Sequence, residues 1–345
     1  MLSVIIPCYN NGNYLKEMLN CFKYQTSSAW EMIIVDDGST DDTPQVINNV
    51  INNMSQVHYI KRDRIPKGSV VCRNIGFEHA KGKYICHLDA DDLVSDTFVE
   101  QRLAFMEANP DVDYASFPTK SFSDKNNLPT FNNPGYTWGI KRDNCDLLKE
   151  MLKGYDYPFS VWNNIYKHSA VEKYRWDEKV LIYTDFSYIV PCILGGLRHR
   201  FSESINVDYY YRNVPNNKNV MTSNFVSREK CESTIYLFDK TLNSFNAHGI
   251  DKKYKKYFFV FFLTHFSRLV LGKCEPELIV SFTQFAAKHY RCRMRLSLVG
   301  NISIINSVPL RHFMLSITYA VFFGKFRLLN TYLISIKKRL LPSQE

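Results

Sequence analysis

The sequence predicts an α/β protein, in which a mainly parallel sheet has helices on both faces and a basic helical region follows it. Two observations support this prediction. Strand-like and helix-like segments alternate through the first third of the 345-residue chain. From about residue 223 the pattern becomes helical, and from residue 252 onward 16 lysines and arginines stand against three acidic residues. That last segment carries a charge of +13 and the remaining chain −4, for a total of +9.

Hydrophobic periodicity gives the position of each element in the first third. Compact β-rich runs predict strands, and apolar residues three and four positions apart predict helices. Strands are expected at residues 2–7, 31–39, 57–62, 83–91 and 112–118. Helices are expected at residues 13–25, 42–54, 68–82 and 95–110, with Pro44 in a first turn and Gly82 and Pro110 at helix ends. Alternation of this kind predicts right-handed crossovers and a parallel sheet.

The later elements are less regular. Residues 118–139 are rich in Asn, Pro, Gly and aromatic residues, and they predict a loop with room for one edge strand. We then expect a helix at 145–154, a strand and short helix at 161–176, an apolar helix at 181–196 and a strand at 205–213. The domain organisation expected from this is residues 1–222, in halves that divide after residue 117, followed by helical residues 223–345.

Acidic residues gather where two predicted strands end. Asp36 and Asp37 lie at the end of the second strand, and Asp89, Asp91 and Asp92 at the end of the fourth. Ligands of parallel sheets bind outside the carboxyl ends of the strands, so both clusters are expected at one site. Crowded carboxylates repel one another, and a divalent cation relieves that repulsion. Oxygen ligands of this kind suit Mg²⁺ or Mn²⁺ held together with the phosphates of a substrate.

Each cluster also has a structural explanation. An Asp-Gly pair after a strand is a common turn. A functional site and a purely structural turn are therefore equally open interpretations of residues 36–39. Acidic residues and serines near a helix start serve as caps, and Asp92, Ser95 and Asp96 suit that role. For Asp89 and Asp91 we favour the metal site.

Other folds with nucleotide or acidic sites fit less well. A dinucleotide-binding domain has Gly-x-Gly-x-x-Gly after its first strand, but here that strand continues into PCYNNGNY, which has one glycine. The phosphate-binding loop of P-loop enzymes is also missing. A haloacid-dehalogenase-type phosphatase would carry its Asp-x-Asp after the first strand and not after the fourth.

Three ordered segments resemble the N-terminal half of family 2 glycosyltransferases: SVIIPCYNNGNYLKEMLNCFKYQT, EMIIVDDGSTDDT and GSVVCRNIGFEHAKGKYICHLDADD. The resemblance is strong to about residue 117 and continues more weakly through VWNNIY, YTDF and DYYYR to residue 212. It implies the GT-A fold, in which the acceptor half is built onto the sheet of one nucleotide-binding domain. It also implies a hexosyltransferase that moves a sugar from a nucleotide-sugar, with a UDP-sugar as the default donor, and inverts the anomeric carbon.

The resemblance also implies a role for each motif residue. The nucleotide-sugar-binding residues would be Pro7, Tyr9, Asn10, Asp36, Asp37, Lys67, Arg73, Asp89 and Arg212. Asp91 would ligate the metal directly, with Asp89 as ribose contact or water-mediated ligand. Asp185 stands where the family carries its catalytic base, although Thr184 replaces the usual glutamate before it. Trp162 and Asn163 are acceptor-side candidates, and Asn164 follows them where the family usually has lysine.

These residues would support a single inverting displacement. Mg²⁺ or Mn²⁺ on Asp91 would neutralise the charge that develops on the leaving nucleoside diphosphate. Asp185 could take the proton of the acceptor hydroxyl as that hydroxyl attacks the anomeric carbon. The expected product is a cell-surface polysaccharide or lipid-linked glycan. The alternatives are a metal-dependent nucleotidyl-transferring or diphosphate-hydrolysing enzyme, and a non-catalytic glycan- or nucleotide-binding partner subunit. Retention of Asp91 and Asp185 together argues against the last.

Two further features have structural interpretations that we prefer. His87 lies within the fourth strand and is expected to be a hydrogen-bonded interior histidine and not a site residue. The three tyrosines of DYYYR are expected to pack on the sheet as part of a strand.

Cellular location follows from cysteine usage and charge. The nine cysteines are scattered without a Cys-x-x-Cys pair, which favours a reducing compartment. No leader peptide is expected ahead of LSVIIP, and residues 312–324 are too short for a straight membrane span of ~20 residues. The basic tail suits either helices on an anionic membrane surface or a packed bundle with a solvated face. We therefore expect a cytoplasmic protein, peripheral on the inner membrane face, that does not bind nucleic acid.

Overall fold

The computed structural model describes residues 1–130, 137–139, 146–152, 157–204, 206–213, 227–271 and 275–290. The chain forms two compact units, Met1–Val220 and Met221–Glu345, which we describe separately. The expected boundary at residues 222 and 223 lies outside the described residues, as do residues 291–345, which contain most of the basic segments of the tail.

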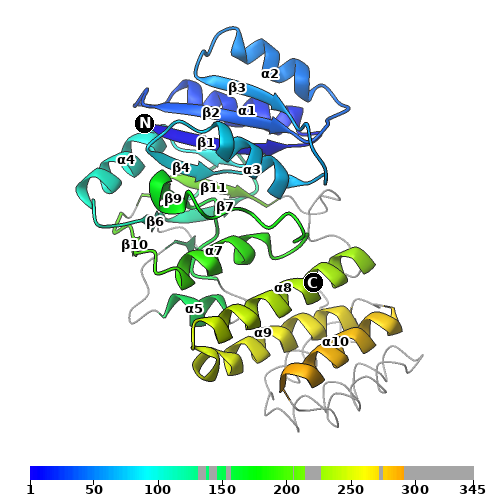
Figure 1. Cartoon of the computed structure of the whole chain (residues 1–345). Coiled ribbons are helices and arrows are strands. Elements are labelled where there is room, and N and C mark those ends of the chain that lie inside the picture. The colour runs from blue at the N-terminus through cyan, green and yellow to red at the C-terminus, as the bar shows by residue number, and fades with distance from the viewer. Residues whose placement is uncertain are drawn as a thin grey trace, which may run out of the picture. The chain divides into compact units, whose positions relative to one another are not determined.

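A mixed seven-stranded sheet forms the centre of the first unit (Figure 1). Its order is β10-β6-β9-β4-β1-β2-β3. The strands are β1 (Leu2–Cys8), β2 (Trp30–Asp36), β3 (Val57–Lys61), β4 (Tyr84–His87), β6 (Tyr114–Ser116), β9 (Asn164–Lys167) and β10 (His199–Phe201). All run parallel except β9, which is antiparallel to both of its neighbours. The expected α/β fold with a mainly parallel sheet is therefore confirmed.

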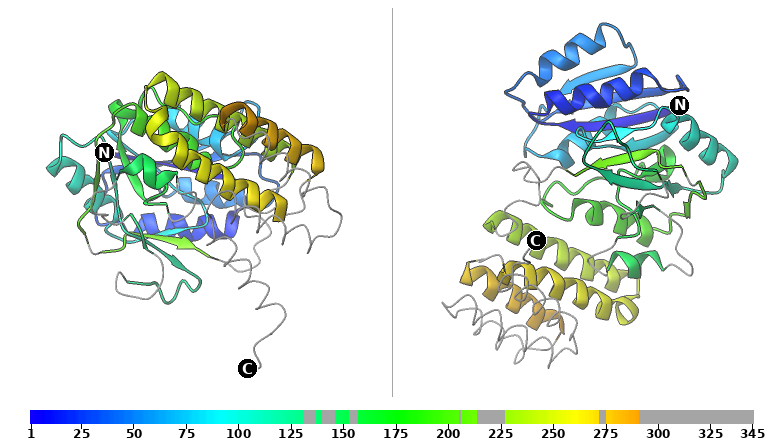
Figure 2. Two further views of the ribbon diagram at one scale, coloured as in Figure 1. Left: turned by 90° about the horizontal axis from the view of Figure 1, so that it is seen from below. Right: turned by 180° about the vertical axis from the view of Figure 1, so that it is seen from behind.

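Helices cover both faces of this sheet, as expected for largely apolar central strands that are joined by right-handed crossovers. Every residue of β1 and β2 is buried, as expected for strands that have helices on both faces. The helices are α1 (Gly12–Lys23), α2 (Thr43–Ile51), α3 (Ser69–His79), α4 (Phe98–Ala108), α5 (Leu147–Met151), α6 (His168–Val171) and α7 (Thr184–Leu194). Figure 2 shows helices on both sides of the sheet. Gly76 lets α3 approach β1 closely, since a Cβ there would lie 2.4 Å from Ile5 Cγ2.

A second, four-stranded sheet was not expected. It has the order β5-β11-β7-β8, with β5 (Leu93–Val94), β7 (Thr119–Phe122), β8 (Thr137–Trp138) and β11 (Tyr209–Arg212). Two of its strands lie within the segment expected to be a loop with one edge strand. The fourth strand of the main sheet ends at His87, so the acidic residues after it form a turn between β4 and β5. We call residues 88–92 the acidic turn.

The capping role expected for Asp92, Ser95 and Asp96 is wrong. Helix α4 begins at Phe98 with Thr97 as its N-cap residue, whose side chain makes no capping hydrogen bond, and the first-turn N–H of Val99 donates instead to Gln25 Oε1 over 3.0 Å. Both carboxylate oxygens of Asp92 accept hydrogen bonds from β11 instead. The acidic stretch continues into a β-strand, and the helix begins later than its apolar pattern indicated.

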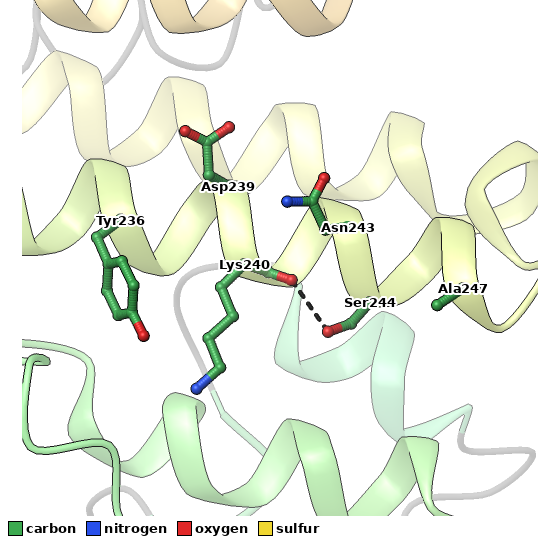
Figure 3. Close-up of a pocket in the computed structure, with 6 residues that line it drawn as sticks. All are labelled: Tyr236, Asp239, Lys240, Asn243, Ser244 and Ala247. Carbon is green, nitrogen blue, oxygen red and sulfur yellow. Dashed lines mark hydrogen bonds between the residues drawn. The ribbon is translucent and has the colours of Figure 1, made fainter.

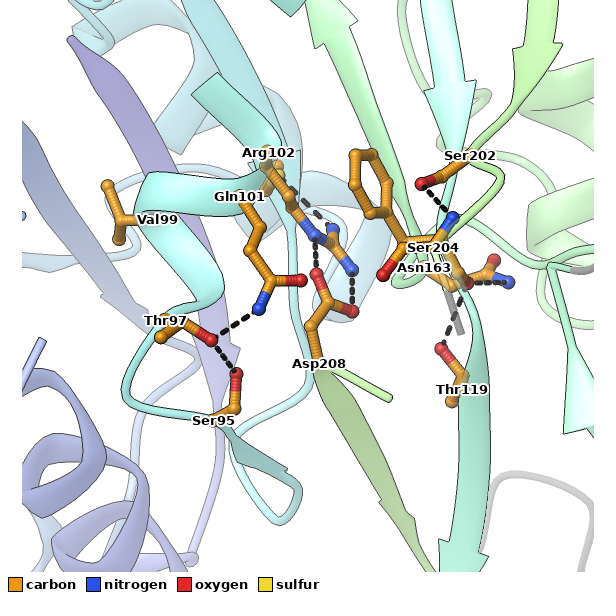
Figure 4. A network of polar contacts seen from close by, with 12 residues as sticks. Ser95, Thr97, Val99, Gln101, Arg102, Thr119, Asn163, Ser202, Ser204 and Asp208 are labelled. Atoms are coloured by element: carbon orange, nitrogen blue, oxygen red, sulfur yellow. Dashed lines mark hydrogen bonds and ion pairs between the residues drawn. The ribbon is translucent and has the colours of Figure 1, made fainter. Parts of the chain in front are cut away.

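A buried ion pair connects α4 to the start of β11 (Figure 4). Arg102 donates from Nε to Asp208 Oδ2 over 2.7 Å and from Nη2 to Oδ1 over 3.0 Å. Both side chains are 0% exposed. The guanidinium also donates to the backbone oxygen of Asn164, at the start of β9, over 3.2 Å. One arginine therefore links α4, the central sheet and the second sheet.

The second unit is helical in its described part. It contains α8 (Arg228–Ala247), α9 (Asp251–Leu271) and α10 (Pro276–Tyr290), which pack through aromatic side chains around Phe238. A hollow of about 510 Å³ on α8 is lined by Tyr236, Asp239, Lys240, Asn243, Ser244 and Ala247 (Figure 3). Among the described helices, none has both the length and the apolar character needed to cross a membrane.

Candidate active site

The two acidic clusters lie on either side of the end of β1. Cys8, the last residue of β1, is in register with Asp36 at the end of β2. The backbone N–H of Asp37 donates to Cys8 O over 2.9 Å, and that of Leu88 donates to Ile5 O over 3.0 Å. Because β1 lies between β2 and β4, the three chain segments that follow these strands meet at one edge of the sheet. The sequence expectation that both clusters share an edge is met.

The first cluster is strongly held by its own chain. Asp36 Oδ1 accepts hydrogen bonds from the N–H and the hydroxyl of Ser39, at 2.8 and 2.6 Å, and Oδ2 accepts one from the Tyr59 hydroxyl at 2.8 Å. Asp37 Oδ1 accepts from Arg62 Nε at 2.5 Å and from Gly68 N at 3.1 Å. Both aspartates are buried. They therefore shape the turns after β2 and β3 whether or not a ligand contacts them.

The turn after β1 presents an exposed aromatic ring. Tyr9 is 46% exposed, and the Nζ of Lys67 lies 3.3 Å from its ring centroid. Asn10, at φ 50°, accepts a hydrogen bond on Oδ1 from Thr40 N over 2.8 Å. Pro7 is buried within β1. Tyr9 and Lys67 form a cation–π pair, which brings together two residues 58 positions apart for which the family resemblance implies a role in nucleotide binding.

The acidic turn concentrates negative charge. Burial, together with the nearby charges of Asp91 and Asp185, raises the pKa of Asp89 to about 6, although an ion pair with Arg73 of α3 opposes this. Burial also raises the pKa of Asp91, which is half-buried. Both groups are therefore poorly compensated as carboxylates, and a divalent cation fits them chemically. Within the described residues no three His, Cys, Asp or Glu side chains gather as a metal site. Mg²⁺ commonly binds through one or two carboxylates plus substrate phosphates.

Strand β11 holds the acidic turn in place. Asp92 accepts hydrogen bonds from the Tyr209 hydroxyl, at 2.5 Å, and from Arg212 N, at 2.7 Å. The Arg212 side chain is 8% exposed, with Nε donating to the backbone oxygen of Asp91 and Nη2 donating to Glu17 Oε2 over 2.6 Å. The structure thus places Arg212 against the backbone of the turn. Sequence reasoning missed Asp92, Tyr209 and Glu17 as partners in this arrangement, because their contacts span more than a hundred residues of chain.

Asp185 lies in the first turn of α7, where the helix dipole favours negative charge. Its Oδ2 accepts a hydrogen bond from the Ser160 hydroxyl. The backbone N–H of Ser160 in turn donates to Asn163 Oδ1 over 2.8 Å. Asn163 is fully buried and also donates to Phe117 O over 3.3 Å. Both of these side-chain hydrogen bonds are therefore made with the protein backbone. Ser160 was not predicted, and no feature of the local sequence indicates that it reaches Asp185.

Trp162 and His87 lie near the acidic turn without reaching it as polar partners. Trp162 stacks on Tyr209 and Tyr211, with centroid distances of 5.3 and 5.5 Å. His87 is interior, as expected, but neither ring nitrogen has a hydrogen-bond partner among the described atoms, so the expectation of a satisfied histidine is wrong. Burial and the charge of Arg73 lower the pKa of His87 well below its ordinary value, which keeps the ring neutral.

The fold, with its acidic clusters at one edge of the sheet, defines a glycosyltransferase of the GT-A type. The chain belongs to glycosyl transferase family 2, whose model matches residues 3–175. This confirms the family, fold and enzyme class that the sequence indicated.

Individual relatives match only in part. The chain is 30% identical to the uncharacterized glycosyltransferase YibD of Escherichia coli over 62% of each chain. It is 35% identical to the putative teichuronic acid biosynthesis glycosyltransferase TuaG of Bacillus subtilis, over 31% of this chain and 42% of that one. The chain therefore covers less than two thirds of either protein.

Solved structures match over more of the chain. TarS of S. aureus, residues 1–349 in complex with UDP-GlcNAc, superimposes with a TM-score of 0.64 at 19% identity and covers 94% of this chain and 92% of that one. The mannosyltransferase PcManGT of Pyrobaculum calidifontis, in complex with GDP-Man and Mn²⁺, gives 0.51 at 15% identity over 92% and 85%. At these identities the likeness concerns the fold.

Proposed function

We propose that the protein is an inverting, divalent-metal-dependent glycosyltransferase that moves a sugar from a UDP-sugar to a hydroxyl group of a glycan or lipid-linked acceptor in cell-surface polysaccharide synthesis. The observation that carries the proposal is the gathering of Asp89, Asp91 and Asp185, where burial first and then the charges of the two neighbouring carboxylates raise the pKa of Asp89 to about 6. Similar proteins support the choice of donor, metal and product. TarS is in complex with UDP-GlcNAc, PcManGT is in complex with GDP-Man and Mn²⁺, and TuaG is named for teichuronic acid biosynthesis.

The donor would bind across the edge formed by β2, β1 and β4. Tyr9, Asn10 and Pro7 would line the nucleoside pocket, and Lys67 would approach the phosphates from its place above the Tyr9 ring. Asp36 and Asp37 would contact the base and ribose through the turns that they shape. Residues 1–117 would thus form the donor half, and residues 118–222 the acceptor half.

The cation would be held by Asp91 and Asp89, with Arg73 setting the orientation of Asp89. When bound, Mg²⁺ or Mn²⁺ would neutralise charge on the departing nucleoside diphosphate. Arg212 donates from Nε to the Asp91 backbone and from Nη2 to Glu17. Its contribution to diphosphate binding would therefore be to support the acidic turn.

Asp185 would remove the proton from the acceptor hydroxyl. The Ser160 hydroxyl donates to Asp185 Oδ2, and this hydrogen bond would orient the carboxylate so that Oδ1 could face the acceptor. Trp162 would provide an apolar wall for the acceptor, and Asn163 would act by holding the backbone of Ser160. The basic C-terminal region, residues 223–345, would bring the cytoplasmic enzyme to an anionic membrane surface where a lipid-linked acceptor is found.

A thermal-shift screen of nucleoside diphosphates with and without Mn²⁺ tests the donor site. Ligand at a hundred times its dissociation constant stabilises a folded protein by about 2.7 kcal/mol. We expect one nucleotide to stabilise the protein strongly, and only when Mn²⁺ is present. Stabilisation that is the same with and without Mn²⁺ would argue against a divalent cation in the donor site.

Product analysis with a panel of nucleotide-sugars then tests the reaction. Transfer of the sugar to an acceptor supports the proposal, whereas release of a nucleotide or phosphate without glycoside formation supports a diphosphate enzyme. Asp185→Asn should abolish transfer while leaving nucleotide binding unchanged. Persistent transfer by this variant would refute the assignment of the base.

A further inference from the structure

We infer that Tyr209 is a positioning residue for the cation site, acting through Asp92 and the backbone of Asp89. This inference rests on the proposed function, because it concerns the residues that would hold the metal. Its basis is a set of contacts that all come from one strand, β11, and all end on the acidic turn.

The Tyr209 hydroxyl makes two contacts across the acidic turn. It donates to Asp92 Oδ2 over 2.5 Å and accepts from the backbone N–H of Asp89 over 3.3 Å. A single oxygen atom therefore joins the first and last aspartates of the turn. The backbone of Arg212 completes the arrangement by donating to the second oxygen of Asp92.

Packing fixes the position of that hydroxyl. The Tyr209 side chain is fully buried, and its ring lies parallel to the Trp162 ring at 5.3 Å with an interplanar angle of 8°. Strand β11 also pairs with β5, which follows the turn directly, with Tyr209 opposite Val94. A ring held on one side by stacking and at its backbone by strand pairing has little freedom to move its oxygen.

Asp92 serves the turn and not the cation. Its side chain is 1% exposed, and both of its oxygens accept hydrogen bonds from β11. Asp89 and Asp91 are only half-buried, and the Asp89 side chain is 33% exposed, so these two are the aspartates of the turn left to face a ligand. Outer partners of this kind orient metal ligands, and their loss typically lowers metal affinity about 10- to 100-fold.

Tyr209→Phe tests the inference, because it removes only the hydroxyl and keeps the stacked ring. Tyr210→Phe is the matched control: the neighbouring Tyr210 hydroxyl donates to Val207 O, at 3.2 Å, and does not touch the acidic turn. In the metal-free protein, Tyr209→Phe should accelerate hydrogen exchange of residues 88–94, and Tyr210→Phe should not.

With the full chain and saturating nucleotide-sugar, Tyr209→Phe should raise the Mn²⁺ concentration for half-maximal activity about 10- to 100-fold. Saturating Mn²⁺ should restore most of the turnover.

The outcomes separate this inference from the proposed function. If the wild type responds to Mn²⁺ and Tyr209→Phe has the same Mn²⁺ requirement as Tyr210→Phe, the positioning role is refuted and the proposed function stands. If the wild type shows no Mn²⁺ requirement, both fail. Unchanged exchange in Tyr209→Phe also overturns the inference. Should Tyr209→Phe not fold, Asp92→Asn, which reverses the hydrogen bond to the tyrosine hydroxyl, must raise the Mn²⁺ requirement in the same way.

Discussion

Replacing Asp208 by Asn should destabilise the first unit by about 3–5 kcal/mol, because it leaves the charge of Arg102 buried without its counter-ion. Both side chains of the pair are 0% exposed. The guanidinium would keep its hydrogen bonds to Asn164 O and Cys86 Sγ, but neither partner carries a charge. Domains are stable by about 5–15 kcal/mol, so the variant should fold with a much lower denaturation midpoint.

Urea unfolding followed by tryptophan fluorescence measures this effect. All four tryptophans lie between residues 30 and 176, so their fluorescence reports on the first unit. Asp111→Asn is the control, since Asp111 and its partner Arg200 are about half exposed and such pairs contribute about 0–1 kcal/mol. The double variant Arg102→Met/Asp208→Leu should recover most of the loss. If Asp208→Asn lowers stability no more than Asp111→Asn does, the buried pair does not have the role that its geometry indicates.

Three further results are expected. Asp91→Asn should remove stabilisation by Mn²⁺ and nucleotide in thermal-shift assays without lowering the metal-free melting temperature, since burial already raises the pKa of that carboxyl; retained Mn²⁺ stabilisation would exclude Asp91 as a ligand. Burial lowers the pKa of His199 to about 3, so the unfolded chain takes up a proton as the pH falls below about 6.5 and the folded protein does not. The contribution of His199 to stability should therefore fall by about 2 kcal/mol between pH 7.5 and pH 5, so the wild type should lose about that much more stability than a His199→Gln variant, and equal acid sensitivity of the two proteins would contradict this. Gly76→Ala should cost about 1–3 kcal/mol in urea unfolding because its Cβ would overlap Ile5 Cγ2, and a loss below 0.5 kcal/mol, roughly the scatter of neutral surface changes, would show that α3 can shift.

Local patterns predicted the elements whose burial is continuous or periodic. Strands β1 and β2 are buried throughout and largely apolar, and α1 buries Leu15, Met18, Leu19 and Phe22 at helical spacing. The acidic residues could be assigned to one edge because the carboxyl ends of parallel strands share it. This much follows from residues that are neighbours in sequence.

The second sheet could not be predicted in the same way. Strands β5 and β8 have two residues each, too few to show alternation. Tyr209 reaches Asp92 across 117 positions, and no local feature of DYYYR distinguishes a hydroxyl that braces a turn from one that packs on a sheet. Ser160 donates its hydroxyl to Asp185, 25 positions away, and its backbone N–H to Asn163 Oδ1, and neither contact is indicated by the local sequence. Long-range contacts of this kind depend on the assembled fold.

The antiparallel direction of β9 has a consequence for where the sequence of such a protein can vary without disturbing the sheet. Asn164, the first residue of β9, is paired with Ser116, the last residue of β6, so the chain enters β9 at the edge where its parallel neighbours leave the sheet. The segment between these two residues therefore begins and ends at the same edge of the sheet. Under the proposed function, insertions or replacements within that segment would change which hydroxyl group accepts the sugar, while β1, β2 and β4, which would hold the donor, keep their register.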